Sequence, residues 1–206
     1  MTKIIIVRHC ETIFNSSGKI QSYYKDSDFT EKGKKQLAQL VSRLKKEKIS
    51  AVFCSDLGRA LKTAEAIAKA HNLKSIPLKG LRECDIGDWH DLSSKEAIAK
   101  WTVFYEAEKK KGVKREEIRP PNGENSFDHQ KRVMDIVNKI VEDFPNETVV
   151  IVGHSGTNKL IISSLQNKDP DDFYNIEQSN AGISIIEING KTAKIISVND
   201  TSHITD

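Results

Sequence analysis

Cysteine is scarce in this sequence, and its spacing matches neither a disulfide framework nor a metal-binding one. The 206 residues include three cysteines, Cys10, Cys54 and Cys84, and no two of them form a CxxC pair. An odd number of widely spaced cysteines argues against a disulfide-stapled scaffold and against a zinc ribbon. The low cysteine content fits a protein of a reducing compartment.

Long apolar segments are also absent. No apolar run reaches the roughly 18 residues that a transmembrane helix requires. The apolar stretch that precedes Arg8 is too short for the apolar region of a signal peptide. No linker, repeat or low-complexity segment is visible, so we expect residues 1–206 to form a single domain. We predict a cytoplasmic protein without a membrane partner.

A coherent basic surface is missing as well. The net charge is +3, and the lysines and arginines are spread along the chain. The densest basic run, Lys109–Lys111, is flanked by Glu106, Glu108, Glu116 and Glu117, which is typical of a solvated helix face. A nucleic-acid partner would need a more continuous basic patch, so we expect none. The sequence leaves a monomer and a homodimer equally open.

What the sequence does contain is an alternation of apolar strands and amphipathic helices. Continuous apolar runs predict buried strands, and apolar residues at intervals of three and four predict helices. The predicted strands cover residues 3–7, 51–55, 75–78 and 148–152, and the predicted helices cover residues 31–46, 57–71, 94–111, 127–144 and 155–165. The chain ends in a predicted hairpin, with strands at residues 183–188 and 194–198 and a turn at Asn189-Gly190.

This alternation predicts an α/β fold. We expect a doubly wound, mostly parallel central sheet with helices on both faces and an antiparallel edge near the C-terminus. Pro77 suggests that the third strand lies at an edge of the sheet. Thr30 and either Ser93 or Ser94 are expected to cap helices. The less regular residues 85–125 are predicted to be a small cap insertion over a site.

Polar side chains follow the predicted parallel strands, where open α/β sheets bind their ligands. They are Arg8 and His9 after the first strand, Ser55, Asp56 and Arg59 after the second, Arg82 and Glu83 after the third, and His154 and Ser155 after the fourth. We therefore expect two histidines, at least two arginines and a carboxylate at one edge of the sheet.

This set of side chains favours phosphoryl transfer. Guanidinium groups match phosphoryl oxygens through paired hydrogen bonds. A neutral, oriented histidine can attack phosphorus, and a second histidine can stabilise the charge. A carboxylic acid can protonate the leaving oxygen and later activate water. The residues thus provide the parts of a metal-free phosphoryl transfer.

Six ordered segments carry a resemblance to a known family. They are Arg8-His9-x-Glu11-Thr12-x-x-Asn15, Phe29-Thr30-Glu31-Lys32-Gly33, Ser55–Ala64, Leu81-Arg82-Glu83 with Gly87-Asp88-Trp89, Asn122–Asn125, and Val152-Gly153-His154. Together they resemble the motifs of the histidine phosphatase superfamily, also called the phosphoglycerate-mutase-like family. The resemblance implies a phosphohistidine on His9, with Glu83 as proton donor, and no metal or organic cofactor.

The same resemblance assigns the site residues. The expected catalytic residues are His9, Glu83, Arg8, Arg59 and His154, and the expected substrate-binding residues are Asn15, Gln21, Ser22 and Ser155. The family's mutases carry E-R-x-Y-G after the acid and a longer insertion, whereas Glu83 is followed here by Cys84–Trp89. The chain thus resembles the phosphatase branch, and we predict a metal-independent hydrolase of a small phosphorylated metabolite. A phosphoglycerate mutase is the alternative.

The substrate is not set by the sequence. Sugar phosphates, phosphoglycerates, phosphoserine and ribazole phosphate all fit the predicted chemistry. Specificity is expected to come from the 16–28 loop and the 85–125 insertion. The expected wall residues are Tyr23, Tyr24, Lys25, Trp89, Trp101 and Arg119.

Two positions depart from the family's pattern, since Cys10 and Ser155 stand where glycine is usual. Side chains there could reshape the pocket and leave a protein that binds a phosphorylated ligand without turnover. We expect Cys10 to be a pocket-shaping, oxidisable neighbour of His9. A cysteine-phosphatase mechanism would require an arginine six residues after Cys10, where Ser16 stands.

A serine esterase is a further alternative. Ser155 follows a strand and opens a helix, as the nucleophile of an α/β-hydrolase does. Its triad would need Asp171 or Asp172 together with His203. The G-x-S-x-G motif, however, requires glycine where Thr157 stands.

Overall fold

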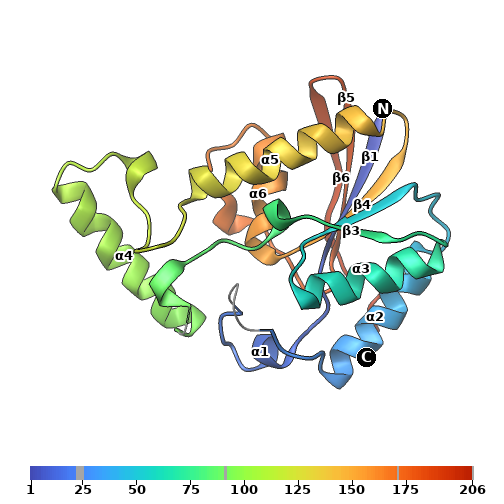
Figure 1. Ribbon diagram of the computed structural model, residues 1–206, viewed down its shortest axis with the longest axis horizontal. Helices are drawn as coiled ribbons and strands as arrows, with labels where there is room; N and C mark the ends of the chain where they lie inside the picture. The colour runs from blue at the N-terminus through green and yellow to red at the C-terminus, as the bar shows by residue number, and fades with distance from the viewer. Residues whose placement is uncertain (22–25, 91, 171, 206) are drawn as a thin grey trace.

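The computed structural model describes residues 1–21, 26–90, 92–170 and 172–205 (Figure 1). Its centre is a six-stranded sheet with the order β3-β2-β4-β1-β5-β6. The strands are β1 (Thr2–Arg8), β2 (Ala51–Cys54), β3 (Ser75–Pro77), β4 (Thr148–Gly153), β5 (Ile183–Asn189) and β6 (Thr192–Asp200). Strands β1 to β4 pair in parallel, and β5 and β6 pair antiparallel. The predicted mixed sheet is confirmed, including β3 at one edge.

The helices follow the predicted pattern closely. They are α1 (Ile13–Ser16), α2 (Glu31–Leu44), α3 (Gly58–Ala70), α4 (Ser94–Lys110), α5 (Ser126–Asp143) and α6 (Ser155–Leu165). Short 3-10 helices are η1 (Lys79–Leu81), η2 (Gly87–Trp89), η3 (Arg115–Glu117) and η4 (Asp172–Asn175). The side chains of Thr30 and Ser93 accept backbone hydrogen bonds at the starts of α2 and α4, as expected of N-caps.

The sheet separates two apolar cores because alternate side chains of a strand point to opposite faces. Ile4 and Ile6 of β1 pack with α5 and α6, whereas Ile5 and Val7 pack with α2 and α3. Figure 1 shows α2 and α3 on one side of the sheet and α5 and α6 on the other. The doubly wound arrangement predicted from the sequence is therefore present. None of the described helices is long and apolar enough to cross a membrane.

Two local features differ from the prediction. The C-terminal hairpin turns at Gly190-Lys191, because Asn189 still pairs with Thr192. Gly190 takes the positive φ of +58° in this turn, a conformation that glycine adopts without strain. The loop predicted from residue 15 contains the end of a short helix, α1, which Thr12 caps.

Residues 85–125, here called the cap segment, carry η2, α4 and η3 and extend away from the sheet (Figure 1). Backbone hydrogen bonds join the two ends of this segment. The amide of Asp88 donates to Pro121 O at 3.0 Å, and the amide of Glu124 donates to Asp85 O at 2.8 Å. Gly87 lies between these bonds with a φ of +54°. The two ends of the cap segment are thus held together by a backbone pairing in which Gly87 takes a conformation that favours glycine.

This attachment predicts a difference between two glycine substitutions. Gly87 and Gly112 both have positive φ, but only at Gly87 would an added Cβ overlap a backbone atom, the carbonyl oxygen of Pro121. Gly112→Ala should lower the free energy of unfolding by about 1 kcal/mol, through backbone strain alone. Gly87→Ala should lower it by roughly 2 kcal/mol more, because of the steric overlap. Urea unfolding measures both values, and equal losses would contradict this attachment.

Candidate active site

The carboxyl ends of β1 and β4 bring two histidines together. Arg8 is paired with Gly153 in the parallel ladder, and the amide of His9 donates to Gly153 O at 3.1 Å. The next residue on each strand is a histidine, and the ring centres of His9 and His154 lie 5.3 Å apart. The two residues are 3% and 1% exposed. The strand register therefore explains why residues so distant in sequence meet.

The His9 ring is held in one tautomer. Its Nδ1 lies 2.9 Å from the carbonyl oxygen of Cys10. Because a carbonyl oxygen can only accept, Nδ1 must carry the hydrogen, and Nε2 of the neutral ring keeps its lone pair. Burial, followed by the charges of Arg59 and Arg8, lowers the pKa of His9 well below its ordinary value. At neutral pH, His9 thus has a fixed orientation and an unprotonated Nε2.

Two arginines, the half-buried Arg8 and the buried Arg59, lie beside the histidines. Arg8 Nη1 donates to Gln178 O at 2.6 Å, and Arg59 Nη2 donates to Gln21 O at 3.2 Å. The Nε atoms of both arginines are buried and have no hydrogen-bond partner among the described residues. Both ring nitrogens of His154 are likewise without a partner there. Buried donors of this kind are satisfied when an anion binds among them.

The charges at this site repel one another. Burial lowers the pKa of Arg8, and the charge of Arg59 adds to that effect, although Glu83 opposes it. Burial is also the main cause that lowers the pKa of His154 well below its ordinary value, followed by Arg59. Asp26 offsets part of the excess charge through an ion pair with Arg59, with Nη1 and Oδ1 3.3 Å apart. A phosphate group would balance the rest.

The carboxylate of Glu83 is held by the first turn of α6. The amides of Gly156 and Thr157 donate to its two oxygens at 2.8 and 3.1 Å, and the amide of Cys84 donates to Oε1 at 3.0 Å. A Cβ at Gly156 would lie 2.5 Å from Glu83 Oε1, so a side chain at this position would displace the carboxylate. The helix that follows His154 therefore also positions Glu83.

The backbone around Glu83 is fixed by Arg132 of α5. Its guanidinium donates to the carbonyl oxygens of Gly80, Arg82 and Glu83 at 2.8, 2.9 and 2.8 Å. Arg132 also makes a paired contact with the carboxylate of Glu124. One side chain thus connects η1, Glu83 and the C-terminal end of the cap segment.

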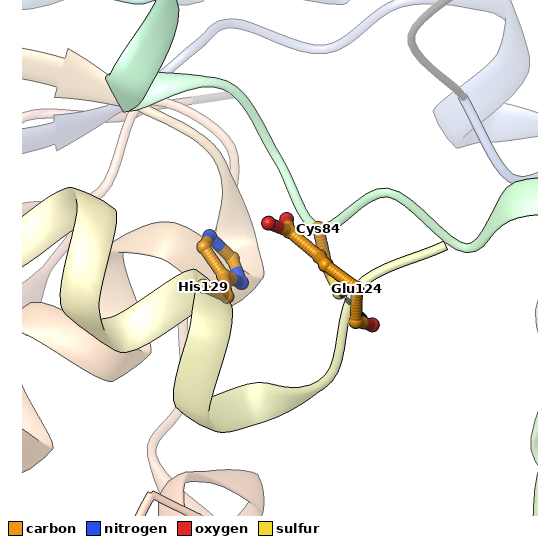
Figure 2. A group of neighbouring side chains, drawn as sticks. All are labelled: Cys84, Glu124 and His129. Atoms are coloured by element: carbon orange, nitrogen blue, oxygen red, sulfur yellow. Dashed lines mark hydrogen bonds between the residues drawn. The ribbon is translucent and has the colours of Figure 1, made fainter. Parts of the chain in front are cut away.

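Cys84, Glu124 and His129 lie close enough to suggest a metal site (Figure 2). Their donor atoms are already engaged, however. Both oxygens of Glu124 accept from Arg132, and Nε2 of His129 lies 3.0 Å from Oγ1 of Thr157. Burial raises the pKa of the Cys84 thiol well above its ordinary value. A cationic guanidinium inside the group does not fit a metal ion, so we read these residues as structural support for Glu83.

The predicted substrate-binding residues have different surroundings. Asn15 Oδ1 accepts from the amide of Thr12 at 3.2 Å and from Asn180 Nδ2 at 3.1 Å. The side chain of Gln21 is used within its own loop, where it accepts from Thr12 and donates to Asp26. Ser155 is the first residue of α6, directly after His154. Ser22 lies outside the described residues.

The expected wall residues differ in whether they line a cleft. Trp89 and Trp101 line a cleft, and their ring centres are 6.1 Å apart. Arg119 forms an ion pair with Asp128 instead. Tyr23, Tyr24 and Lys25 lie outside the described residues.

Several residues near the histidines were missed from the sequence. Asn180 Nδ2 donates to His9 O at 3.0 Å, and Gln178 O accepts from Arg8. Both residues precede β5, which runs antiparallel, so its start lies at the same sheet edge as the ends of the parallel strands. A search for residues before an antiparallel strand would have found them. Lys159 of α6, whose pKa is lowered by burial and by Arg8, was also missed.

Cys10 does not reach the pocket. Its side chain is fully buried in the apolar core of the α2 and α3 face. Burial raises the pKa of the thiol to about 12, so the reactive thiolate is not formed at neutral pH. The expectation of a pocket-shaping, oxidisable Cys10 is therefore wrong, because the backbone directs this side chain away from His9.

The serine-esterase triad is also not assembled. His203 lies in a pocket with Gln39 and Arg43 of α2. Helices α2 and α6 contribute to the apolar cores on opposite faces of the sheet. Asp171 lies outside the described residues. His203 therefore cannot serve as the base for Ser155, and this alternative is wrong.

Comparison with known proteins identifies the family. The model of the histidine phosphatase superfamily (branch 1) matches residues 4–201. The chain is 31% identical to a metal-independent phosphoserine phosphatase of Arabidopsis thaliana, covering 100% of this chain and 84% of that protein. It is 29% identical to phosphoserine phosphatase 1 of Hydrogenobacter thermophilus, covering 99% and 95%.

A solved structure supports the same assignment. A phosphoserine phosphatase variant of Entamoeba histolytica, in complex with phosphoserine, matches with a TM-score of 0.85 and 25% identity, over 100% of both chains. The chain therefore belongs to the histidine phosphatase superfamily and is a phosphatase of this type. The resemblance noted from its sequence motifs is confirmed.

The buried histidines predict how stability depends on pH. Burial, and then the charge of Arg132, lowers the pKa of His129 well below 6.5, as burial also does for His9 and His154. Below about pH 6.5 the unfolded chain binds protons that the folded chain does not bind, so stability is lost as the pH falls. Above that pH the full stability is present.

The variant His129→Gln should weaken this dependence. We expect the slope of unfolding free energy against pH, between pH 6.5 and 5, to fall by up to about 1.4 kcal/mol per pH unit. Urea unfolding of the wild type and the variant at three pH values measures the slope. An unchanged slope would show that His129 is protonated in the folded protein.

Proposed function

We propose that this protein hydrolyses small phosphomonoesters through a phosphohistidine on His9, without a metal ion. The observation that carries the proposal is the oriented His9, whose Nε2 is unprotonated, beside two arginines with buried Nε atoms that have no partner among the described residues. Such a group combines a nucleophile with a phosphate-binding pocket. The relative from Arabidopsis thaliana is a metal-independent phosphoserine phosphatase, which agrees with the metal-free part of the proposal.

The reaction proceeds in two steps. Nε2 of His9 attacks phosphorus, the bond from phosphorus to the ester oxygen breaks, and that oxygen takes a proton from the protonated form of Glu83. Water then attacks the phosphohistidine, passes a proton to Glu83, and the bond from phosphorus to nitrogen breaks. Arg8, Arg59 and His154 hold the phosphoryl oxygens throughout, where charge develops in the transition state.

The position of Glu83 supports its part in both steps. Its carboxylate is held by the turn that follows His154, through the amides of Gly156 and Thr157. An acid that acts on the leaving oxygen must lie close to the phosphoryl group and stay in place between the steps. Backbone amides provide this constraint without another charged side chain.

A phosphoglycerate mutase remains the second candidate. Several relatives bear that name, including a probable phosphoglycerate mutase of Cronobacter sakazakii that is 29% identical over 80% of this chain. A mutase must keep water from the phosphohistidine, whereas a phosphatase admits it. The short segment after Glu83 favours the phosphatase. Release of inorganic phosphate from 3-phosphoglycerate, rather than its conversion to 2-phosphoglycerate, would separate the two.

His9→Ala should reduce the hydrolysis of p-nitrophenyl phosphate by at least about 10³-fold, because no nucleophile remains. Circular dichroism should show a folded variant.

The wild-type enzyme, quenched during turnover of a ³²P-labelled substrate, should carry an acid-labile label that the variant lacks. EDTA should leave the wild-type rate unchanged. Hydrolysis at the wild-type rate by His9→Ala would refute the mechanism, and phosphate binding without turnover in the wild type would favour a binding protein.

Gly156→Ala tests how the carboxylate of Glu83 is held, without altering any side chain that is proposed to react. The new methyl group would displace the carboxylate, so we expect kcat to fall by about 10²-fold while the fold is kept. Gly190→Ala, in the turn between β5 and β6, is the control: its φ of +58° strains an alanine, but the new Cβ meets no atom within 4 Å, so kcat should not change. The kinetics of both variants with phenyl and benzyl phosphate give the result. A larger loss with benzyl phosphate, the poorer leaving group, is expected if proton donation is affected, and an equal loss would contradict it.

A further inference from the structure

A single apolar cleft lies between the cap segment and the residues next to Glu83. Its volume is about 440 Å³, within the range of small-molecule sites. The main apolar lining residues are Ile20, Ile86, Trp89, Ile98, Trp101 and Phe173. Ile20 comes from the 16–28 loop, which an isolated bridge between Lys19 and Ser93 connects to the start of α4. Both segments expected to decide specificity therefore contribute to one cleft.

The cleft borders the reacting groups on two sides. Cys84 lines it, and the amide of Cys84 donates to the carboxylate of Glu83. Ile20 lines it on another side, and the carbonyl of the next residue, Gln21, accepts from Arg59. The group that leaves phosphorus must lie beside the acid that protonates it. The leaving group is thus the part of a substrate that would enter this cleft.

Four polar side chains that line the cleft already bond to other groups of the protein. Glu124 is paired with Arg132, and His129 is bonded to Thr157. Asn125 donates to Glu116 O and accepts from the amide of Asp128, and Thr102 donates to Ile98 O. These four side chains are therefore already engaged within the protein.

No lysine or arginine lines the cleft among the residues that the structure describes. Lys100 lies with Nζ 5.3 Å from the centre of the Trp89 ring, but it is not a lining residue. Among the described lining residues, a carboxylate would therefore meet no lysine or arginine, and an ammonium group would meet one carboxylate, that of Glu124, which Arg132 neutralises. Burying an unpaired charge is strongly unfavourable.

We propose that the alcohol released by this phosphatase is uncharged and carries an aromatic or other apolar body, which binds in this cleft. The proposal rests on the hydrolase function proposed above and concerns its substrate class. It separates this chain from the relatives named phosphoserine phosphatases, because serine carries both an ammonium and a carboxylate group. The indole rings of Trp89 and Trp101 form the wall against which an aromatic group packs.

Three esters of primary alcohols test the proposal. Ethyl phosphate, benzyl phosphate and phosphoserine differ in the body of the alcohol rather than in the type of ester bond. We expect kcat/KM for benzyl phosphate to exceed that for ethyl phosphate by about 100-fold, from burial of the phenyl ring. Phosphoserine should be no better than ethyl phosphate. A preference for phosphoserine over benzyl phosphate would overturn the cleft proposal and leave the hydrolase function standing.

A pair of substitutions on α4 locates the effect. Ile98 and Val103 are 65% and 73% exposed, and only Ile98 lines the cleft. Ile98→Ser should lower kcat/KM for benzyl phosphate by roughly five-fold and leave ethyl phosphate unchanged. Val103→Ser, the matched control, should change neither. Equal effects of the two variants on benzyl phosphate would contradict binding in the cleft.

Binding can be followed without turnover. The chain has two tryptophans, and both line the cleft, so intrinsic fluorescence reports on its occupancy. Benzylphosphonate should change the emission of the wild-type protein and bind at least ten-fold more tightly than methylphosphonate. Equal affinities would overturn the proposal. If none of the three esters were hydrolysed, the hydrolase function would fail, and this titration would still decide what the cleft binds.

Discussion

The positive charge that Arg8 and Arg59 bring to one edge of the sheet is the constraint on which this site depends. Burial lowers the pKa of both guanidinium groups, and the charge of Arg59 lowers that of Arg8 further. Burial, followed by the charge of Arg59, also lowers the pKa values of His9 and His154 well below their ordinary value. In the mechanism proposed above, a bound phosphoryl group would balance the charge of the arginines while Nε2 of His9 stays unprotonated for the attack.

The proposed proton donor, Glu83, is positioned by a different set of contacts. Glu83 is held at its carboxylate by the first turn of α6 and at its backbone by Arg132. Arg132 in turn holds Glu124, where the cap segment returns to the body. The chain therefore uses one half-buried ion pair to connect the acid with the segment that borders the cleft. Removal of either partner would leave a partly buried charge without its counter-ion.

Most of the fold and the central part of the site follow from the sequence. Apolar periodicity predicted every strand of the sheet, and the rule of strand ends selected Arg8, His9, Arg59, Glu83 and His154. That rule considers parallel strands, so it missed Asn180 and Gln178, which precede an antiparallel strand. It also gave no direction for the side chain of Cys10, because a residue just beyond a strand can point either way. Such orientations depend on tertiary contacts that a pattern of residue types does not contain.

The attachment of the cap segment has a consequence for how this enzyme can diversify. Its two ends are joined by backbone hydrogen bonds around Gly87, and among the described residues no side chain of α4 belongs to either apolar core. Substitutions at exposed positions of α4 should therefore have little effect on the packing of the two cores. Ile98 and Trp101 of this helix line the cleft. Its shape and polarity can thus change through one helix, while the groups around His9 and Glu83 keep their places.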